Sequence, residues 1–189
     1  MKLLVASASR HGSTTEIAER IAAQLRAAGH TVDVATADPS RWLDDEHDGY
    51  IIGSSVYFGN WLRDARRFVE CNAAVLAGRP VWLFSSGPLG EQPAVGITTG
   101  HLRTLTDLTK ARSHEVFFGR LRRADLNRFE RLVVRITRAP FGDFRDWDRV
   151  DRWVAEVDAE LAGDAPTSRE ANGTPRRQRQ SEAPPSGGG

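Results

Sequence analysis

The chain has 189 residues, of which 40% are hydrophobic, and 26 basic and 25 acidic side chains give it a formal net charge of +1. This length indicates one domain with an adequate core, and the near-neutral charge argues against general nucleic-acid binding, which needs a concentrated basic face. The single cysteine, Cys71, excludes an internal disulfide and a cysteine metal cluster. We expect it to be a buried, inert thiol of a cytoplasmic protein.

The chain opens with an apolar strand that leads through a polar turn into a helix. Residues 3–5 are Leu-Leu-Val, which is typical of a central parallel strand buried on both faces. A helix is predicted next because apolar side chains recur every four positions, at Ile17, Ile21 and Leu25. Ser13 and Glu16 have the spacing of a capping box, which places the helix start near Ser13, and Gly29 ends the helix.

The turn itself, residues 9–14, predicts a phosphate site. The hydroxyls of Ser9, Ser13 and Thr14 can donate to phosphate oxygens, and Gly12 lets the backbone approach closely. Bare N–H groups at the start of a helix attract anions. Since neither G-x-G-x-x-G nor a Walker lysine is present, the turn suits a monophosphate such as that of FMN. The alternative is an ordinary strand–turn–helix with a well-capped helix.

The rest of the chain alternates strands and helices. Strands are predicted over residues 32–36, 50–54, 81–86 and 115–119. Helices are predicted over residues 61–76, 102–111 and 147–161, with Asp146 or Asp148 at the start of the last. These elements predict a three-layer, doubly wound α/β domain whose five-stranded parallel sheet has the order 2-1-3-4-5.

The domain is expected to span residues 1–162. The composition changes at residue 163, and residues 163–189 are rich in Pro, Gly, Ser and Arg, so we expect a disordered tail. No stretch approaches the roughly 20 apolar residues of a membrane span, and we expect no signal peptide.

Two further loops should lie beside the phosphate turn, because ligands of such sheets bind at the carboxyl ends of the strands. One loop follows the third strand and contains Ser54, Ser55, Val56, Tyr57, Phe58, Gly59 and Asn60. The other follows the fourth strand and contains Ser85, Ser86, Gly87 and Pro88. Tyr57 or Phe58 can stack on a planar ring, or these rings and Trp61 anchor the next helix in the core.

The turn Ser9-Arg10-His11-Gly12-Ser13-Thr14 resembles the phosphate loop of flavodoxins, Ser/Thr-x-Thr-Gly-x-Thr, except that His11 replaces a threonine. Its Ser-Arg-x-Gly-x-Thr form, followed by Glu-Ile-Ala, is more similar to the flavodoxin-like family of menaquinone-dependent protoporphyrinogen IX dehydrogenases. The resemblance implies one noncovalent FMN, with its phosphate on residues 9–14 and its ring between the other two loops. Arg10 lies beside the phosphate or faces solvent, and no side chain is assigned a catalytic role because the chemistry belongs to the flavin.

Residues 120–138 form an unusually basic segment, with seven arginines against Asp125 and Glu130 and apolar residues interleaved among them. The pattern predicts an amphipathic helix, which either lies on an anionic membrane surface or packs on the sheet with solvated arginines. The resemblance favours a membrane role, because the dehydrogenase family carries a similar basic insertion associated with the membrane and its quinone. Peripheral contact with the inner face of the cell membrane is therefore expected.

Three functions that use a bound FMN fit this sequence. The resemblance implies an oxidoreductase that passes electrons from a porphyrinogen through FMN to menaquinone. The alternatives are an NAD(P)H:quinone reductase and an electron-transfer flavodoxin, although such carriers are usually acidic around the flavin. A fourth possibility is a scaffold that has lost its flavin, which the departure at His11 would explain. We expect no metal and no nucleic-acid partner, and association into a homo-oligomer stays open.

Overall fold

Five parallel strands form the centre of the computed structural model, which describes residues 1–44, 46–57, 59–87, 99–122 and 141–164. They are β1 (Lys2–Ala8), β2 (Thr31–Thr36), β3 (Gly49–Tyr57), β5 (Val81–Ser86) and β6 (Ser113–Phe117). Their order is β2-β1-β3-β5-β6. This confirms the predicted order, because the additional strand β4 (Asn60–Trp61) only pairs antiparallel with the end of β3.

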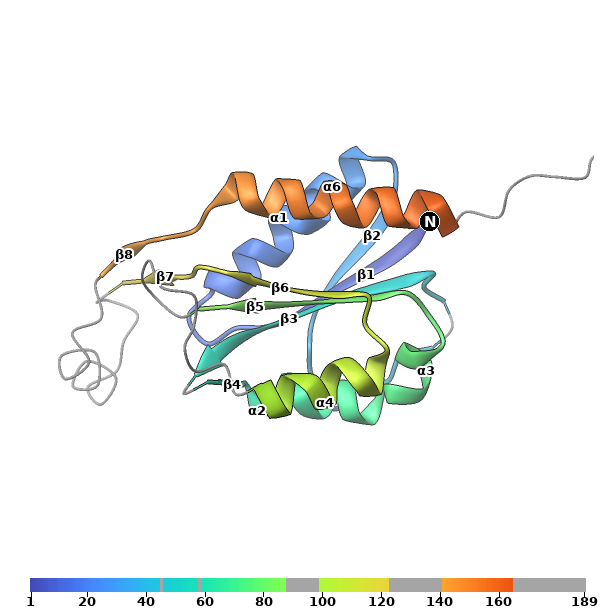
Figure 1. The fold of residues 1–189 in the computed structure, drawn as a ribbon, viewed down its shortest axis with the longest axis horizontal. Helices are drawn as coiled ribbons and strands as arrows, with labels where there is room; N and C mark the ends of the chain where they lie inside the picture. The colour runs from blue at the N-terminus through green and yellow to red at the C-terminus, as the bar shows by residue number, and fades with distance from the viewer. Residues whose placement is uncertain (45, 58, 88–98, 123–140, 165–189) are drawn as a thin grey trace, which may run out of the picture.

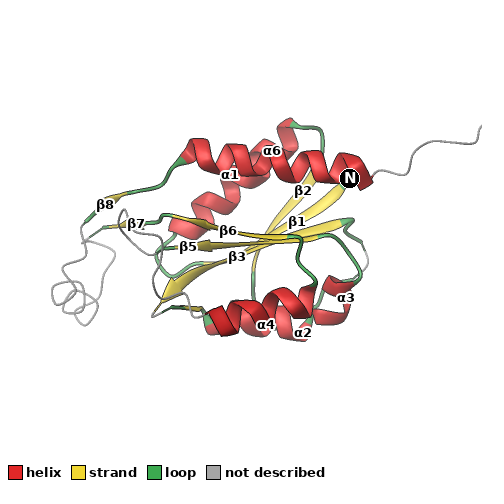
Figure 2. Ribbon diagram, viewed as in Figure 1, coloured by secondary structure: helices red, strands yellow, loops and turns green. Residues whose placement is uncertain are grey.

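Helices cover both faces of this sheet (Figure 1). One face carries α1 (Ser13–Ala27) and α6 (Trp147–Asp164), and the other carries α2 (Arg63–Cys71), α3 (Ala73–Ala77) and α4 (Thr99–Thr109). Figure 2 shows the three layers by element type. A two-stranded ladder of β7 (Arg120–Leu121) and β8 (Gly142–Asp143) extends from one end of the sheet (Figure 1). The predicted three-layer α/β architecture is therefore confirmed.

The core consists of two apolar layers, one on each face of the sheet, because successive side chains of a strand point to opposite faces. Leu3 and Val5 belong to the layer under α1 and α6, whereas Leu4 and Ala6 belong to the layer under α2 and α4. The strand β3 needs glycine at position 53, since a Cβ there would lie 2.0 Å from the Phe84 ring. Gly53 thus leaves room for the Phe84 ring to lie over β3.

The predicted helix over 61–76 is wrong in its bounds. Trp61 lies in β4, and the helix is interrupted at Asn72 between α2 and α3. The buried Asn72 amide donates to the carbonyl oxygens of Phe68 (2.8 Å) and Arg41 (3.0 Å) and accepts from the Leu43 N–H (2.8 Å). The side chain therefore competes with the helical backbone and fastens the loop after β2.

The ends of α1, α2 and α6 test three smaller expectations. The thiol of Cys71 is exposed at the end of α2, so the expectation of a buried cysteine is wrong. The predicted capping box is absent, because the N-cap of α1 is Gly12, which has no side chain to accept a hydrogen bond. The last helix continues to Asp164 rather than 161, and its start is confirmed, since the Asp146 carboxylate accepts from the Arg149 N–H at 2.9 Å.

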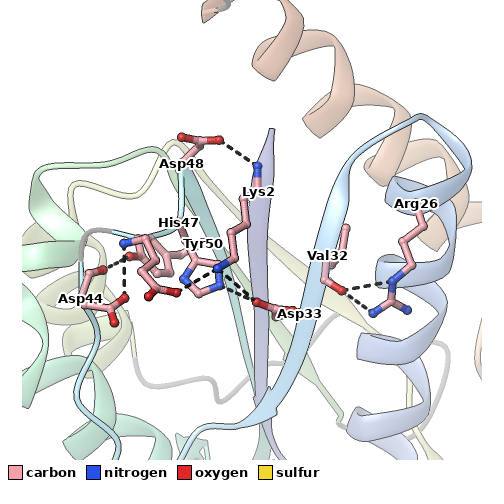
Figure 3. Close-up of polar contacts among 9 residues, drawn as sticks. Lys2, Arg26, Val32, Asp33, Asp44, His47, Asp48 and Tyr50 are labelled. Atoms are coloured by element: carbon pink, nitrogen blue, oxygen red, sulfur yellow. Dashed lines mark hydrogen bonds and ion pairs between the residues drawn. The ribbon is translucent and has the colours of Figure 1, made fainter.

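Polar contacts close the end of the sheet where β1 and β3 begin (Figure 3). The Lys2 N–H donates to Asp48 at 2.8 Å, and His47 Nε2 lies 3.0 Å from Asp33 Oδ2. These contacts fasten the connection between β2 and β3 onto the sheet. The loops at the opposite end, where the strands finish, are left to form a site.

Candidate functional site

The three predicted loops leave the sheet at one edge. Ala8 at the end of β1 lies beside Ser54 of β3, and Ser54 lies beside Ser85 of β5. Ser86 in turn lies beside Phe117 of β6, and the Gly87 N–H donates to the Phe117 carbonyl at 3.0 Å. The parallel register therefore brings the carboxyl ends of four strands together, which is where such sheets bind ligands.

Residues 9–14, which we call the phosphate loop, hold two serine hydroxyls through backbone N–H groups. Gly12 turns the chain with φ of +81°, a conformation that glycine adopts without strain. Ser9 Oγ accepts from the Thr14 N–H at 3.3 Å, and Ser13 Oγ accepts from the Arg120 N–H at 3.0 Å. Because a hydroxyl can accept and donate at the same time, each serine can still donate its hydrogen to a bound ligand.

Thr14 provides the sharpest sign of a ligand. Its side chain is 1% exposed, and its hydroxyl has no hydrogen-bond partner among the described residues. A buried hydroxyl without a partner costs about 1–3 kcal/mol, so such groups in native proteins need an explanation. An oxyanion at the loop would accept from this hydroxyl and from the two serines, so the residues present fit a phosphate.

The loop after β3 is a tight hairpin. Val56 pairs with Trp61 and Tyr57 with Asn60, and Gly59 in the turn has φ of +77°. The half-buried Tyr57 ring is contacted by the phosphate loop, since the Arg10 guanidinium lies 5.3 Å and the His11 ring 6.2 Å from its centroid. Arg10 therefore lies against an aromatic ring, and the first two predicted loops touch one another.

Two serines of the predicted cofactor loops use their hydroxyls to hold this hairpin. Ser54 Oγ donates to the Ser55 carbonyl (2.9 Å) and accepts from the Leu62 N–H (3.0 Å). Ser85 Oγ accepts from the Trp61 indole N–H at 2.7 Å. Both serines are fully buried, so their side chains fix the loops rather than face outward. Ser55, in contrast, keeps a buried hydroxyl with no partner among the described residues.

His114 contacts Ser85, and the sequence did not identify it as a site residue. Its Nε2 lies 2.8 Å from Ser85 Oγ, and burial lowers the pKa of His114 to about 4. The ring is therefore neutral at pH 7, and its Nε2 shares one hydrogen bond with the Ser85 hydroxyl. No motif marks this histidine, since it reaches the site through the pairing of β5 with β6, where it lies beside Leu83.

A charged cluster adjoins the phosphate loop and was also missed. The Glu16 carboxylate accepts from both terminal nitrogens of Arg120, at 2.7 and 2.8 Å, and it also pairs with Arg145. Arg145 donates through Nε to Asp143 at 2.7 Å and stacks on Trp147, 4.6 Å from the ring centroid. Burial alone would raise the pKa of Glu16, but hydrogen bonds from the two arginines outweigh burial and lower that pKa below its ordinary value.

Some predicted residues are not placed. Phe58, Pro88 and residues 123–138 of the basic segment lie outside the described residues. Within the described ranges, no group of three His, Cys, Asp or Glu side chains is arranged to hold a metal ion. No helix of the described part is long and apolar enough to cross a membrane.

Comparisons with known proteins agree with this geometry. The sequence family described as Flavodoxin domain matches residues 4–147. A protein of Escherichia coli (strain K12) named protoporphyrinogen IX dehydrogenase (quinone) is 25% identical over 173 residues, which cover 83% of this chain and 94% of that protein.

Solved flavodoxins share the fold. A flavodoxin from the domain Archaea has a TM-score of 0.58 at 14% identity and covers 86% of this chain and 99% of its own. Oxidised flavodoxin 1 of Bacillus cereus also has a TM-score of 0.58, at 18% identity, covering 85% of this chain and 98% of its own. The similarity therefore extends over nearly the whole of both flavodoxins.

Proposed function

The chain belongs to the flavodoxin domain family, whose cofactor is FMN, and on that premise we propose that it is an oxidoreductase that transfers electrons to a quinone. FMN supplies the redox chemistry, since its isoalloxazine ring accepts and releases electrons and hydrogen. This chain would supply the residues that hold its phosphate and its ring.

The phosphate loop carries the proposal. The hydroxyls of Ser9 and Ser13 accept from backbone N–H groups, which leaves their hydrogens available to a phosphate, and the Thr14 hydroxyl is buried without a partner among the described residues. These groups lie at the first turn of α1, where the helix dipole favours a negative charge. They support the assignment of the FMN phosphate to residues 9–14, with Gly12 allowing the close approach.

The ring of FMN is assigned to the edge between the β3–β4 hairpin and the residues after β5. Tyr57 is the described aromatic residue best suited to stack on it, because the Trp61 ring is 4% exposed and its N–H is bound to Ser85. Ser55, which has a buried hydroxyl, and the backbone of Gly87 lie at the same edge. Arg10 and His11 contact Tyr57. These two residues would therefore lie between the FMN ring and the FMN phosphate.

An enzyme is favoured over a mobile electron carrier by the charges beside the site. Carriers usually surround the flavin with acidic groups that dock a basic partner. Here the two carboxylates beside the phosphate loop, Glu16 and Asp143, are paired with Arg120 and Arg145, and Arg10 adds a positive charge at the same edge. A porphyrinogen substrate and a menaquinone acceptor are proposed from the similarity to the Escherichia coli dehydrogenase.

We also propose that the basic segment brings the protein to the membrane in which its quinone dissolves. Its first residues, Arg120 and Leu121, form β7, at the end of the sheet where the phosphate loop lies (Figure 1). Arginines beside apolar side chains attract anionic lipid headgroups at short range. Peripheral contact there would place the flavin edge near the quinone.

The first experiment is an FMN titration of the purified full chain, followed by anaerobic reduction with protoporphyrinogen IX and reoxidation with a soluble menaquinone analogue. Stoichiometric FMN binding, reduction by the porphyrinogen and rapid reoxidation by the quinone are expected. Slow reoxidation would make the protein an electron carrier. Failure of the folded chain to bind FMN would mean that the loop with His11 has lost its ligand.

A further inference from the structure

We propose that Glu16, Arg120 and Arg145 form a latch that positions the Ser13 hydroxyl for the cofactor phosphate and couples phosphate binding to closure of the β7–β8 ladder. The inference rests on the proposed function, because it takes residues 9–14 as the phosphate site. It adds three positioning residues, which act on the phosphate site through the Ser13 hydroxyl.

One carboxylate holds both strands of the ladder. Arg120 begins β7 and Arg145 follows β8, and both side chains bind Glu16 in the first turn of α1. Within the ladder, Arg120 lies opposite Asp143, which also binds Arg145. The two strands are therefore fastened to the helix that follows the phosphate loop, at a point one turn after Gly12.

The latch acts on the phosphate loop through a main-chain contact. When the Arg120 side chain is held by Glu16, the Arg120 N–H points at Ser13 Oγ, 3.0 Å away. This contact occupies an acceptor position on the hydroxyl and leaves its hydrogen free to point toward a phosphate oxygen. The chain also passes close to the loop just before Arg120, since a Cβ on Gly119 would lie 3.6 Å from Ser13 Oγ. Closure of the β7–β8 ladder and orientation of the Ser13 hydroxyl therefore occur together.

The ion pairs of the latch are shielded from water. The side chains of Arg120 and Arg145 are 10% and 6% exposed, whereas that of Glu16 is 40% exposed. Removing the charge of Glu16 would take away the carboxylate that binds Arg120 and would leave Arg145 paired with Asp143. A nearly buried cation without a partner is unfavourable, so the ladder would open and the Arg120 N–H would leave Ser13.

A purely electrostatic role of Glu16 predicts the opposite result. A carboxylate near a phosphate dianion repels it, so neutralising Glu16 would strengthen FMN binding if charge alone mattered. The latch predicts weaker FMN binding instead. Riboflavin, which has the same ring and no phosphate, should bind Glu16→Gln as well as it binds the native chain.

The test measures dissociation constants of FMN and riboflavin by flavin fluorescence for the full chain and for Glu16→Gln, Ser13→Ala and the double variant. Glu19→Gln is the matched control, because it removes the same charge from an exposed position of the same helix. We expect Glu16→Gln to weaken FMN binding roughly three- to tenfold and to leave the dissociation constant of riboflavin unchanged. In the double variant, Glu16→Gln should weaken FMN binding little beyond the effect of Ser13→Ala. Glu19→Gln should change neither constant.

Hydrogen exchange of the native chain provides a second readout that needs no variant. FMN should increase the protection of amides 119–121 and 142–145, and riboflavin should not, because binding and closure are reciprocally linked. Equal protection by both ligands, or tighter FMN binding by Glu16→Gln, would overturn the latch while leaving the phosphate site intact. If the native chain does not distinguish FMN from riboflavin, the phosphate site and the latch are both wrong.

Discussion

Trp61 donates its indole N–H to the hydroxyl of Ser85 across 2.7 Å, although 24 residues separate them. The bond joins the hairpin after β3 to the end of β5, and both partners are buried. Ser85 also reaches His114 of β6, so a single hydroxyl connects three strands at the edge assigned to the flavin ring. The two ring loops thus share one rigid support, which is the condition for a site with fixed geometry.

Replacing this hydroxyl should destabilise the protein. Ser85→Ala removes the hydroxyl that binds the buried indole N–H and His114 Nε2, and we expect a loss of about 1–3 kcal/mol in the free energy of unfolding. Urea unfolding measures this loss. In the Trp61→Phe background, which lacks the indole donor, the same change should cost less. Equal costs in the two backgrounds would show that the Trp61–Ser85 bond contributes nothing.

The low pKa of His114 predicts an acid-sensitive fold. The pKa is about 4 in the folded chain against 6.5 ordinarily, so between these values the unfolded state binds more protons than the folded state. The stability from neutral His114 is fully present above about pH 6.5 and is lost as the pH falls toward about 4. The full shift corresponds to a few kcal/mol, as an order of magnitude.

His114→Gln removes the titrating group and leaves an amide that can still accept from Ser85. Unfolding free energies measured at several pH values between about 7 and 4 should therefore fall more steeply for the native chain than for this variant. Parallel pH profiles would mean that the His114 ring is protonated in the folded protein without cost.

The fold was predictable because its signals are local. The apolar run at residues 3–5 and the four-residue repeat of Ile17, Ile21 and Leu25 correctly gave β1 and α1. The strand order followed from general rules on crossovers, and it is confirmed. The errors occurred where side chains override the pattern, as at Asn72, whose amide binds a distant loop and interrupts the helix.

The site was predictable only in part, because its support comes from long-range pairs. The phosphate loop is a contiguous motif, and the structure brings Arg10 and His11 of this loop against Tyr57 of the next loop. The contact between Glu16 and Arg145 spans 129 residues, and the spacing of Glu16 from Ser13 suggested a capping role instead. The periodicity of the sequence cannot predict such a long-range ion pair, because only the assembled sheet brings α1 and β8 together.

Thr14→Val should have opposite effects on the free and the FMN-bound protein. Valine has nearly the shape of threonine without the hydroxyl that lacks a partner, so the free protein should be stabilised by about 1 kcal/mol. FMN binding should weaken by about 1–3 kcal/mol, because a hydrogen bond to a charged phosphate is lost. Thermal unfolding and FMN titration measure the two effects, with riboflavin binding as the control. A loss of stability in the free protein would contradict a ligand-directed hydroxyl.

Charge reversal in the basic segment should separate membrane binding from cofactor binding. Changing Arg128, Arg131 and Arg135 to glutamate removes the attraction to anionic headgroups, which contributes about 1 kcal/mol per basic residue near the surface. Co-sedimentation with phosphatidylglycerol vesicles should therefore fall strongly, while the dissociation constant of FMN stays the same. The matched control reverses the exposed Arg63, Arg67 and Arg103 on α2 and α4, away from the phosphate loop, and should retain vesicle binding. Loss of FMN affinity with the first set would instead make the basic segment a structural part of the flavin site.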